Sequence, residues 1–321
     1  MTTTEERSRP EVASPSAGEN VIYVGMDGSP TAEGAAIWAA RDAHRRGAAL
    51  CLVHVENLIV AGYAGEVVYP ASIFDADRVW NQTVLTKVTD QITTTFPGLE
   101  VRTVVSPGAP VEVLRRLARH GLMTVVGSHG THQFTDVTLG SIAAGSVTHG
   151  RGPVVVVRAD PATGTVRGAG PVVVALDGLP DSDDALGFAF EEADLRGRVL
   201  VAVHTWNDAA FDGFAYTDPI EVNRTLIDDQ ETRLLAEQLA GWVDRYPDVM
   251  VTPVVLRGSP AATLLRYCSS EGHVQPELLV VGSRGRGGFA GLLLGSTSQA
   301  LIAHAPCPVA VVRGRHDAAS R

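Results

Sequence analysis

The chain has 321 residues, about twice the length of a typical domain, so its length predicts two domains. Apolar residues make up 45% and charged residues 19%, a composition that excludes a disordered chain. The formal net charge of −10 opposes a phosphate backbone and an anionic membrane surface, so we expect neither a nucleic acid nor a membrane partner.

Both ends of the chain have the composition of tails, over residues 1–19 and 315–321. The opening segment lacks the apolar stretch of a signal peptide, and no apolar run is long enough to span a bilayer. The three cysteines are odd in number and form no C-x-x-C motif, which favours reduced thiols. Together these features predict a cytoplasmic protein.

Between residues 20 and 158, short β-branched runs alternate with longer helical patterns. The expected strands are 21–26, 49–55, 100–105, 123–127 and 154–157, and the expected helices are 31–46, 72–96, 110–119 and 139–148. The strand runs are apolar throughout rather than alternating, which is typical of parallel strands covered by helices on both faces. This segment therefore predicts a doubly wound α/β domain with a five-stranded parallel sheet.

After a Pro- and Gly-containing linker at residues 159–170, the same pattern returns over residues 171–314. The expected strands there are 172–176, 199–204, 250–256, 278–282 and 309–312. An offset of 150 aligns Asp27 with Asp177 and, after five extra residues near 269–277, an offset of 155 aligns Arg158 with Arg313. We conclude that the chain is a tandem repeat of one domain, 20–158 and 171–314.

The last strand of each unit, at 154–157 and 309–312, is expected at a sheet edge, where a long apolar strand needs cover. The two units could cover each other within the chain. A homodimer stays open as an additional arrangement.

Each unit carries a G-x2-G-x9-G-S motif directly after its fourth strand. The motif residues are Gly127, Gly130, Gly140 and Ser141 in the first unit, and Gly282, Gly285, Gly295 and Ser296 in the second. We expect Gly127 and Gly130 to allow backbone conformations and close approaches that a Cβ would block, and Gly140 to leave room beside an anion. We expect Ser141 to cap the following helix and to add a hydroxyl. Free amides at a helix start bind anions, so the motif predicts a phosphate site in each unit. The single lysine, Lys87, lies outside any glycine loop, which excludes a P-loop.

Asp27 and Asp177 each end the first strand of their unit. They therefore lie at the carboxyl ends of the parallel strands, where the glycine loops also begin. A carboxylate there can accept hydrogen bonds from ribose hydroxyls or from an adenine amino group. The alternative is that Asp27 only stabilises the turn and the start of the next helix. Asp-Gly followed by Ser29 and Pro30 is a favourable sequence for both features. Recurrence opposite both glycine loops favours the ligand contact.

The sequences of 24–29, 125–130, 140–141 and 304–313 together resemble the universal stress protein family, in the tandem two-domain form found in actinobacteria. The resemblance covers residues 20–158 and 170–314 and implies Rossmann-like domains of the adenine nucleotide alpha hydrolase-like type. In that family the glycine–serine motif marks the ATP-binding branch. The resemblance therefore implies one ATP per domain, with Mg²⁺, and a nucleotide-dependent sensor or regulator in stress response or dormancy that acts on an unknown protein partner.

By motif matching, the resemblance assigns nucleotide contacts to both aspartates and all eight motif residues. It also implies backbone contacts to adenine at Val55 and Thr205. Leu179 departs from the pattern, since it stands where the first unit has Ser29, and we expect Asp181, Asp183 and Asp184 to compensate for the lost helix cap. Such differences predict unequal affinities of the two halves.

Other nucleotide and metal chemistries fit less well. Residues 285–290 match a dinucleotide pattern, but no acid stands about 20 residues further on, and the first unit breaks the pattern. His129 and His132 lack a third ligand nearby, and Arg284 replaces His129 in the second unit, so no metal site is expected. Arg284 and Arg286 are better placed to pair with phosphate oxygens.

The sequence places no nucleophile with a base, and no carboxylate dyad, on matching loops, so we expect no catalytic residue and no enzyme. Two alternatives stay open. One is a slow ATPase or nucleotidyl-transferring enzyme, and the other is a nucleotide-free interaction protein whose glycines only build turns.

Overall fold

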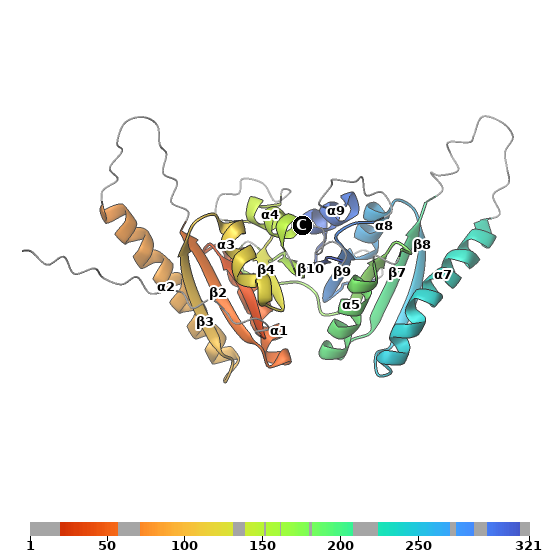
Figure 1. Cartoon of the computed structure of the whole chain (residues 1–321), viewed down its shortest axis with the longest axis horizontal. Helices are drawn as coiled ribbons and strands as arrows, with labels where there is room; N and C mark the ends of the chain where they lie inside the picture. Colours follow the sequence, from red (N-terminus) through yellow and green to blue (C-terminus); the bar gives the residue numbers. More distant parts are fainter. Residues whose placement is uncertain are drawn as a thin grey trace, which may run out of the picture.

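The computed structural model (Figure 1) describes residues 20–56, 71–130, 139–150, 152–160, 162–179, 182–207, 224–269, 274–285 and 294–314. Side chains are described within these ranges except at 71–81 and 224–225. The two tails lie outside the described residues. So do His132, Asp181 and Arg286, whose roles were predicted from the sequence.

The first domain alternates strands and helices, as its apolar runs predict. Its elements are β1 (Val21–Met26), α1 (Pro30–Arg46), β2 (Ala49–Glu56), α2 (Ala71–Thr95), β3 (Val101–Pro107), α3 (Pro110–Leu117), β4 (Met123–Gly127), α4 (Ser141–His149) and β5 (Val154–Val157). The strands pair in parallel in the order β3-β2-β1-β4-β5. The order reverses at β1 and β4, so the carboxyl ends of these two strands border the crevice in which ligands bind in such sheets.

The second domain repeats this arrangement. Its elements are β6 (Val172–Leu176), α5 (Asp183–Arg196), β7 (Leu200–Trp206), α7 (Arg224–Arg245), β8 (Val251–Arg257), α8 (Pro260–Tyr267), β9 (Leu278–Gly282), α9 (Ser296–His304) and β10 (Val309–Val312). These strands are also parallel, in the order β10-β9-β6-β7-β8. The expectation of two doubly wound domains with five parallel strands each is confirmed.

The two sheets join edge to edge into one ten-stranded sheet. The joint is antiparallel, with Val309 opposite Val156 and Val311 opposite Val154. Figure 1 shows α4 and α9 near this central joint, and α2 and α7 at the two outer ends of the molecule. The apolar last strands therefore cover each other within one chain, which removes both inner edges of the sheet.

Each face of the sheet carries its own apolar core, because successive strand residues point to opposite sides. Ile22 and Val24 of β1 belong to a core on one face that also includes buried residues of α1, α2, α5 and α7. Val21 and Tyr23 belong to the core on the other face, with buried residues of α3, α4, α8 and α9. Burial on both faces explains why the strand sequences are continuously apolar.

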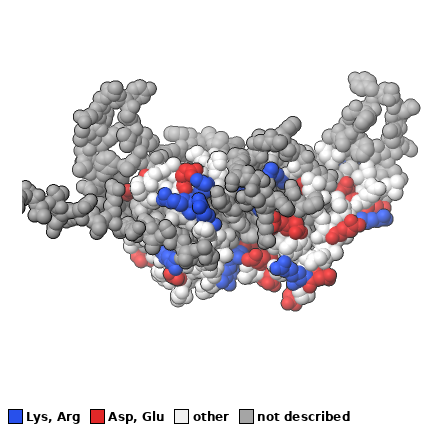
Figure 2. Space-filling view, in the orientation of Figure 1, with Lys and Arg blue, Asp and Glu red and all other residues white. Residues whose placement is uncertain are grey.

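The surface is mixed in charge. Figure 2 shows acidic and basic side chains in small interspersed groups over the described part of the visible face. None of the helices in the described ranges combines the length and the apolar composition needed to cross a bilayer.

A buried group of charges connects the two domains below the sheet joint. We call it the α1–α5 charge cluster, and its members are Asp42, Arg46, Glu192 and Arg196. Arg46 Nε lies 2.9 Å from Asp42, and Arg196 Nη2 lies 2.7 Å from Glu192. Across the domain boundary, Arg196 Nη2 lies 2.6 Å from Asp42, and Arg46 donates to Glu192. The offset of 150 aligns Asp42 with Glu192 and Arg46 with Arg196, so the cluster has approximate twofold symmetry.

Glu277, which directly precedes β9, extends this cluster. Its carboxylate accepts from Arg45 at 2.9 Å, from Arg196 at 3.1 Å and from Arg198 at 3.0 Å. Burial raises the pKa of Glu277, but the charges of Arg196 and Arg45 outweigh that effect and hold its pKa below the usual value. Because Arg45 belongs to α1, Glu277 ties the second domain to the first. Leu122, at the aligned position of the first domain, has no carboxylate for such a contact.

Because of the charge cluster, we expect the unfolding free energy of the wild type to depend on pH. The Glu192→Gln variant should lose this dependence. Burial, and then the nearby charge of Asp42, raise the pKa of Glu192 from 4.5 to about 7, against the opposing charges of Arg196 and Arg46. Between these two pH values the folded protein holds a proton that the unfolded chain has lost, so stability falls as pH rises through that window. Relative to Glu192→Gln, we expect wild-type unfolding free energy to fall by at most ~1.4 kcal/mol per pH unit.

Urea unfolding from pH 4.5 to 8 measures this difference. Glu191→Gln is the matched control, because Glu191 also pairs with Arg46 but its side chain is 51% exposed. We expect the control to follow the wild-type pH profile. Parallel profiles for wild type and Glu192→Gln would contradict the assignment.

Candidate functional site

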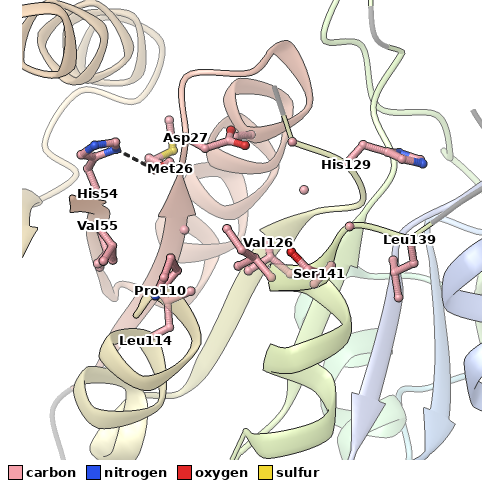
Figure 3. Close-up of a pocket in the computed structure, with 18 residues that line it drawn as sticks. Met26, Asp27, His54, Val55, Pro110, Leu114, Val126, His129, Leu139 and Ser141 are labelled. Atoms are coloured by element: carbon pink, nitrogen blue, oxygen red, sulfur yellow. Dashed lines mark hydrogen bonds between the residues drawn. The ribbon is translucent and has the colours of Figure 1, made fainter. Parts of the chain in front are cut away.

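Two cavities open at the carboxyl ends of the central strands, one in each domain. Their volumes are about 500 Å³ in the first domain and about 760 Å³ in the second. The first is lined by Asp27, Val55, Gly127, Gly130, Gly140 and Ser141, and the second by Asp177, Thr205, Gly282, Gly285, Gly295 and Ser296. All twelve residues singled out from the sequence thus lie on one or the other cavity wall. Figure 3 shows the first cavity between the ends of β1 and β2, helix α3 and the start of α4.

Asp27 serves the turn after β1 and also faces the glycine loop. Its Oδ1 accepts from the backbone N–H of Ser29 at 3.0 Å and from the Ser29 hydroxyl at 2.6 Å. Its Oδ2 lies opposite Gly130, where an added Cβ would come within 2.6 Å of it. Gly28 has φ 78°, a left-handed conformation that favours glycine in this turn. The turn and the cavity-facing carboxylate are therefore compatible, because each uses a different oxygen.

Asp177 repeats this geometry with one difference. Its Oδ1 accepts from the backbone N–H of Leu179 at 3.0 Å. Its Oδ2 is buried and has no hydrogen-bond partner among the described residues. An added Cβ on Gly285 would lie 3.1 Å from that oxygen. A buried carboxylate oxygen without a donor is unfavourable by ~1–3 kcal/mol or more, so this cavity wall suits a ligand that donates a hydrogen bond.

The structure corrects one part of the reason expected for Gly127 and Gly130, the need for an unusual backbone conformation. None of the six motif glycines, all within the described residues, has a positive φ. Gly127 is needed for a close approach, because its Cβ would lie 3.0 Å from the backbone of Thr31 in α1. Gly140 and Gly295 have φ −63° and −71°, and a Cβ there would meet its nearest atom only at 3.4 and 3.6 Å. Their missing side chains therefore keep the cavity open and relieve no backbone strain.

The predicted role of the serines as helix caps is wrong. Gly140 and Gly295 occupy the N-cap positions, and Ser141 and Ser296 are the first residues of α4 and α9. Neither helix start has a side-chain cap. The first-turn amides of a helix lack partners within the helix, so each cavity receives donors and the positive end of a helix dipole.

Short backbone hydrogen bonds hold each loop in place. The Ser128 N–H donates to Val157 of β5 at 2.9 Å, and the Gly140 N–H donates to Ser128 at 2.9 Å. In the second domain, Ser283 donates to Val312 of β10 at 2.8 Å, and Gly295 donates to Ser283 at 2.8 Å. The last strand of each domain therefore sets the position of its own glycine loop.

The two cavities differ in charge beside the loop. His129 lines the first, with its Nδ1 2.7 Å from the hydroxyl of Ser128, and Arg284 lines the second. Arginine is permanently charged and can pair with two phosphate oxygens at once, whereas histidine titrates near neutral pH. Within the described ranges, no three His, Cys, Asp or Glu side chains gather closely enough to hold a metal ion.

The apolar wall opposite the glycine loop was not predicted from the sequence. Pro110 and Leu114 of α3 line the first cavity, and Pro260 and Leu264 of α8 line the second. The signal that could have found them is the repeat itself, because the offset of 150 aligns both pairs. An apolar wall facing polar donors is the usual composition of a site for a small organic ligand.

His54 and His204 fix the strand ends beside the predicted adenine contacts. His54 Nδ1 lies 2.9 Å from the Met26 carbonyl, and His204 Nδ1 lies 3.1 Å from the Leu176 carbonyl. His204 is 1% exposed, and its second nitrogen lies 2.9 Å from Glu231 of α7. These contacts hold the backbone of Val55 and Thr205 at the cavity rim.

The cysteines are buried and form no disulfide. Burial raises the pKa of Cys268 to about 12 and also raises that of Cys307. Cys307 is 3% exposed and packs as a small buried apolar residue.

Comparison with known proteins agrees with this architecture. The sequence model of the universal stress protein family matches residues 20–158 and 169–313. The chain is 35% identical over 313 residues to a universal stress protein of Mycobacterium tuberculosis, covering 93% of this chain and 96% of the relative. It is 38% identical over 307 residues to one of Mycolicibacterium smegmatis, covering 94% and 99%.

Among solved structures, a universal stress protein from Archaeoglobus fulgidus superposes with a TM-score of 0.66. Its identity to this chain is 21%, and the match covers 94% of this chain and 99% of the other. At that identity the likeness supports the fold alone.

Proposed function

The chain belongs to the universal stress protein family, and we propose that it binds one ATP in each domain and acts as a nucleotide-dependent regulator in the cytoplasm under stress. In this proposal, occupancy of the two cavities changes the surface that the protein presents to a regulatory partner. The protein is a sensor in this role and not an enzyme.

The observation that carries the proposal is the Oδ2 of Asp177, which has no hydrogen-bond partner among the residues that the structure describes. This oxygen is buried at the wall of a cavity of about 760 Å³ and faces the glycine loop. A ribose hydroxyl donates the hydrogen bond that the carboxylate lacks. A volume of several hundred cubic ångströms is in the range typical of sites for ligands of nucleotide size.

The remaining cavity residues suit the other parts of the nucleotide. The amides at the start of α4 or α9, with the open positions at Gly140 or Gly295, suit the phosphates. The apolar walls at Leu114 or Leu264 suit the adenine ring, with the backbone of Val55 or Thr205 at its edge. Mg²⁺, if bound with the triphosphate, neutralises part of its charge. The second site binds more tightly in this proposal, because Arg284 replaces His129 beside the phosphates.

Equilibrium dialysis with ATP and millimolar Mg²⁺ tests the proposal. We expect two ATP per chain and a rise in unfolding temperature with ATP concentration. At 100 times the dissociation constant, one site adds ~2.7 kcal/mol to the unfolding free energy. A protein that binds no ATP, and whose thermal unfolding is indifferent to it, is instead a nucleotide-free interaction protein.

Turnover separates the sensor from an enzyme. Product release should stay at background in purified protein with both sites filled. If ATP hydrolysis persists through purification and its rate falls with a substitution in the cavity, the protein is an ATPase and not a sensor.

A further inference from the structure

Each domain ends in an arginine whose side chain reaches into the other domain. We call Arg158 and Arg313 the crossed arginines. Arg158 follows β5 of the first domain and donates to backbone carbonyls at the end of α9, to Ala305 at 3.2 Å and to Ala303. Arg313 follows β10 of the second domain and donates to the end of α4, to Val147 at 2.9 Å and to Thr148.

The antiparallel joint produces this exchange. Val311 of β10 lies opposite Val154, the first residue of β5. A residue that follows β10 therefore arrives where β5 begins, close to the end of α4. The same pairing brings the residue after β5 to the region where α9 ends and β10 begins. The repeat alignment of Arg158 with Arg313 is thus explained by a shared role in the joint.

A guanidinium is well suited to the end of these helices. The last carbonyls of a helix have no partner within it, and the helix dipole favours a cation there. Arginine is charged at all physiological pH values and offers five donors. The helices α4 and α9 have only nine residues each. Isolated helices of that length are not stable in water, so tertiary contacts must hold them.

The opposite ends of the same two helices form the phosphate sides of the cavities, at Ser141 and Ser296. Resting on the proposed nucleotide sites, we propose that the crossed arginines are positioning residues: Arg313 holds the phosphate-binding helix of the first domain, and Arg158 holds that of the second. Each site then depends on a side chain from the other domain.

The backbone beside each arginine serves its own domain, which separates the two roles. The carbonyl of Val157, next to Arg158, accepts from Ser128 in the first glycine loop. The carbonyl of Val312, next to Arg313, accepts from Ser283 in the second. Replacing an arginine side chain leaves these backbone bonds in place and removes only the crossed contact.

Hydrogen–deuterium exchange tests the contact without any ligand. In Arg313→Met we expect faster amide exchange in α4 by about three- to tenfold, with α9 unchanged, in line with the effect of a partly buried cation at a helix end. In Arg158→Met we expect the reverse. Arg313→Lys, which keeps the charge, should restore part of the protection. Equal changes in both helices, or none in either, would overturn the inference.

Nucleotide affinity is measured in chains with one site disabled. With the second site removed by Gly295→Asp, Arg313→Met should weaken ATP binding about three- to tenfold and Arg158→Met should change it less than twofold. With the first site removed by Gly140→Asp, the two effects should exchange. Arg233→Met, at an exposed position on α7, is the control and should leave both affinities unchanged.

The outcomes distinguish the two proposals. If the wild-type protein binds no ATP, the proposed function fails, while the exchange experiment still decides the crossed contact. If ATP binds but each arginine acts on the site of its own domain, or on both sites equally, the crossed arginines do not position the phosphate-binding helices. A folded Arg→Lys variant, checked by its unfolding temperature, decides the case if a methionine variant fails to fold.

Discussion

Gly140→Asp is expected to lower the nucleotide affinity of the first domain by at least about a hundredfold. Gly295→Asp should do the same in the second domain. Each wild-type glycine is at an N-cap with ordinary extended backbone. Aspartate is a preferred N-cap residue and a favourable charge at a helix start, so the variants should fold, with stability unchanged or raised by up to ~1 kcal/mol. The new carboxylate would instead occupy the position proposed for the phosphates and repel them.

Equilibrium dialysis should give one ATP per chain for each variant and none for the double variant. Gly140→Ala is the matched control, because its Cβ would make only ordinary contacts and adds no charge. We expect it to retain the site. If the double variant still binds two ATP, the phosphates lie elsewhere. The unfolding temperature of each variant is measured as well, because a variant that loses ATP binding through loss of its fold would unfold at a lower temperature than the wild type.

Arg196→Met should destabilise the protein by about 3–5 kcal/mol, the usual effect of removing one partner from a buried ion pair. The Arg196 side chain is 1% exposed and contacts Asp42, Glu192 and Glu277. Its guanidinium also lies 5.2 Å from the ring centroid of Trp38. Without it, three buried carboxylates lose their shared cation, and the contact between α1 and α5 loses its central donor.

Denaturant unfolding followed by tryptophan fluorescence measures the effect. Arg198→Met is the control, since Arg198 also pairs with Glu277 but is 43% exposed. We expect a loss below ~1 kcal/mol there, as for other exposed pairs. Equal losses for the two variants would show that the α1–α5 charge cluster does not stabilise the joint between the domains. Arg196→Lys should fall between wild type and Arg196→Met, because lysine keeps the charge but loses the planar fork of donors.

The strands and the cavity residues could be predicted because their signals are local. Six strands, among them β1, β4 and β5, have the bounds that the apolar runs predict. Parallel pairing places the carboxyl ends of all strands on the same side of the sheet. Asp27 and Gly127 lie at the ends of two such strands, so the fold class alone predicts that they are close. The cap roles of Ser141 and Ser296 were predicted wrongly, because a Gly-Ser pair at a helix start does not reveal which residue is the N-cap.

The joint between the domains could not be predicted in the same way. The sequence of β5 is four consecutive valines, so its pattern specifies neither a register nor a partner direction. Asp42, Arg46, Glu192 and Arg196 occur at helical spacing, where charges usually face solvent. Only the packing of α1 against α5 buries them, and only that burial raises the pKa of Glu192.

By itself, the sequence determined the repeat, the two parallel sheets and the loops that line the cavities, because periodicity and turn chemistry act over a few residues. The tertiary structure decided that the sheets join antiparallel through β5 and β10. It also decided that the side chains of Arg158 and Arg313 each contact the other domain, and that the four ionisable side chains of the α1–α5 charge cluster are buried. These features depend on pairs of residues about 150 positions apart, and no local pattern constrains how such pairs meet.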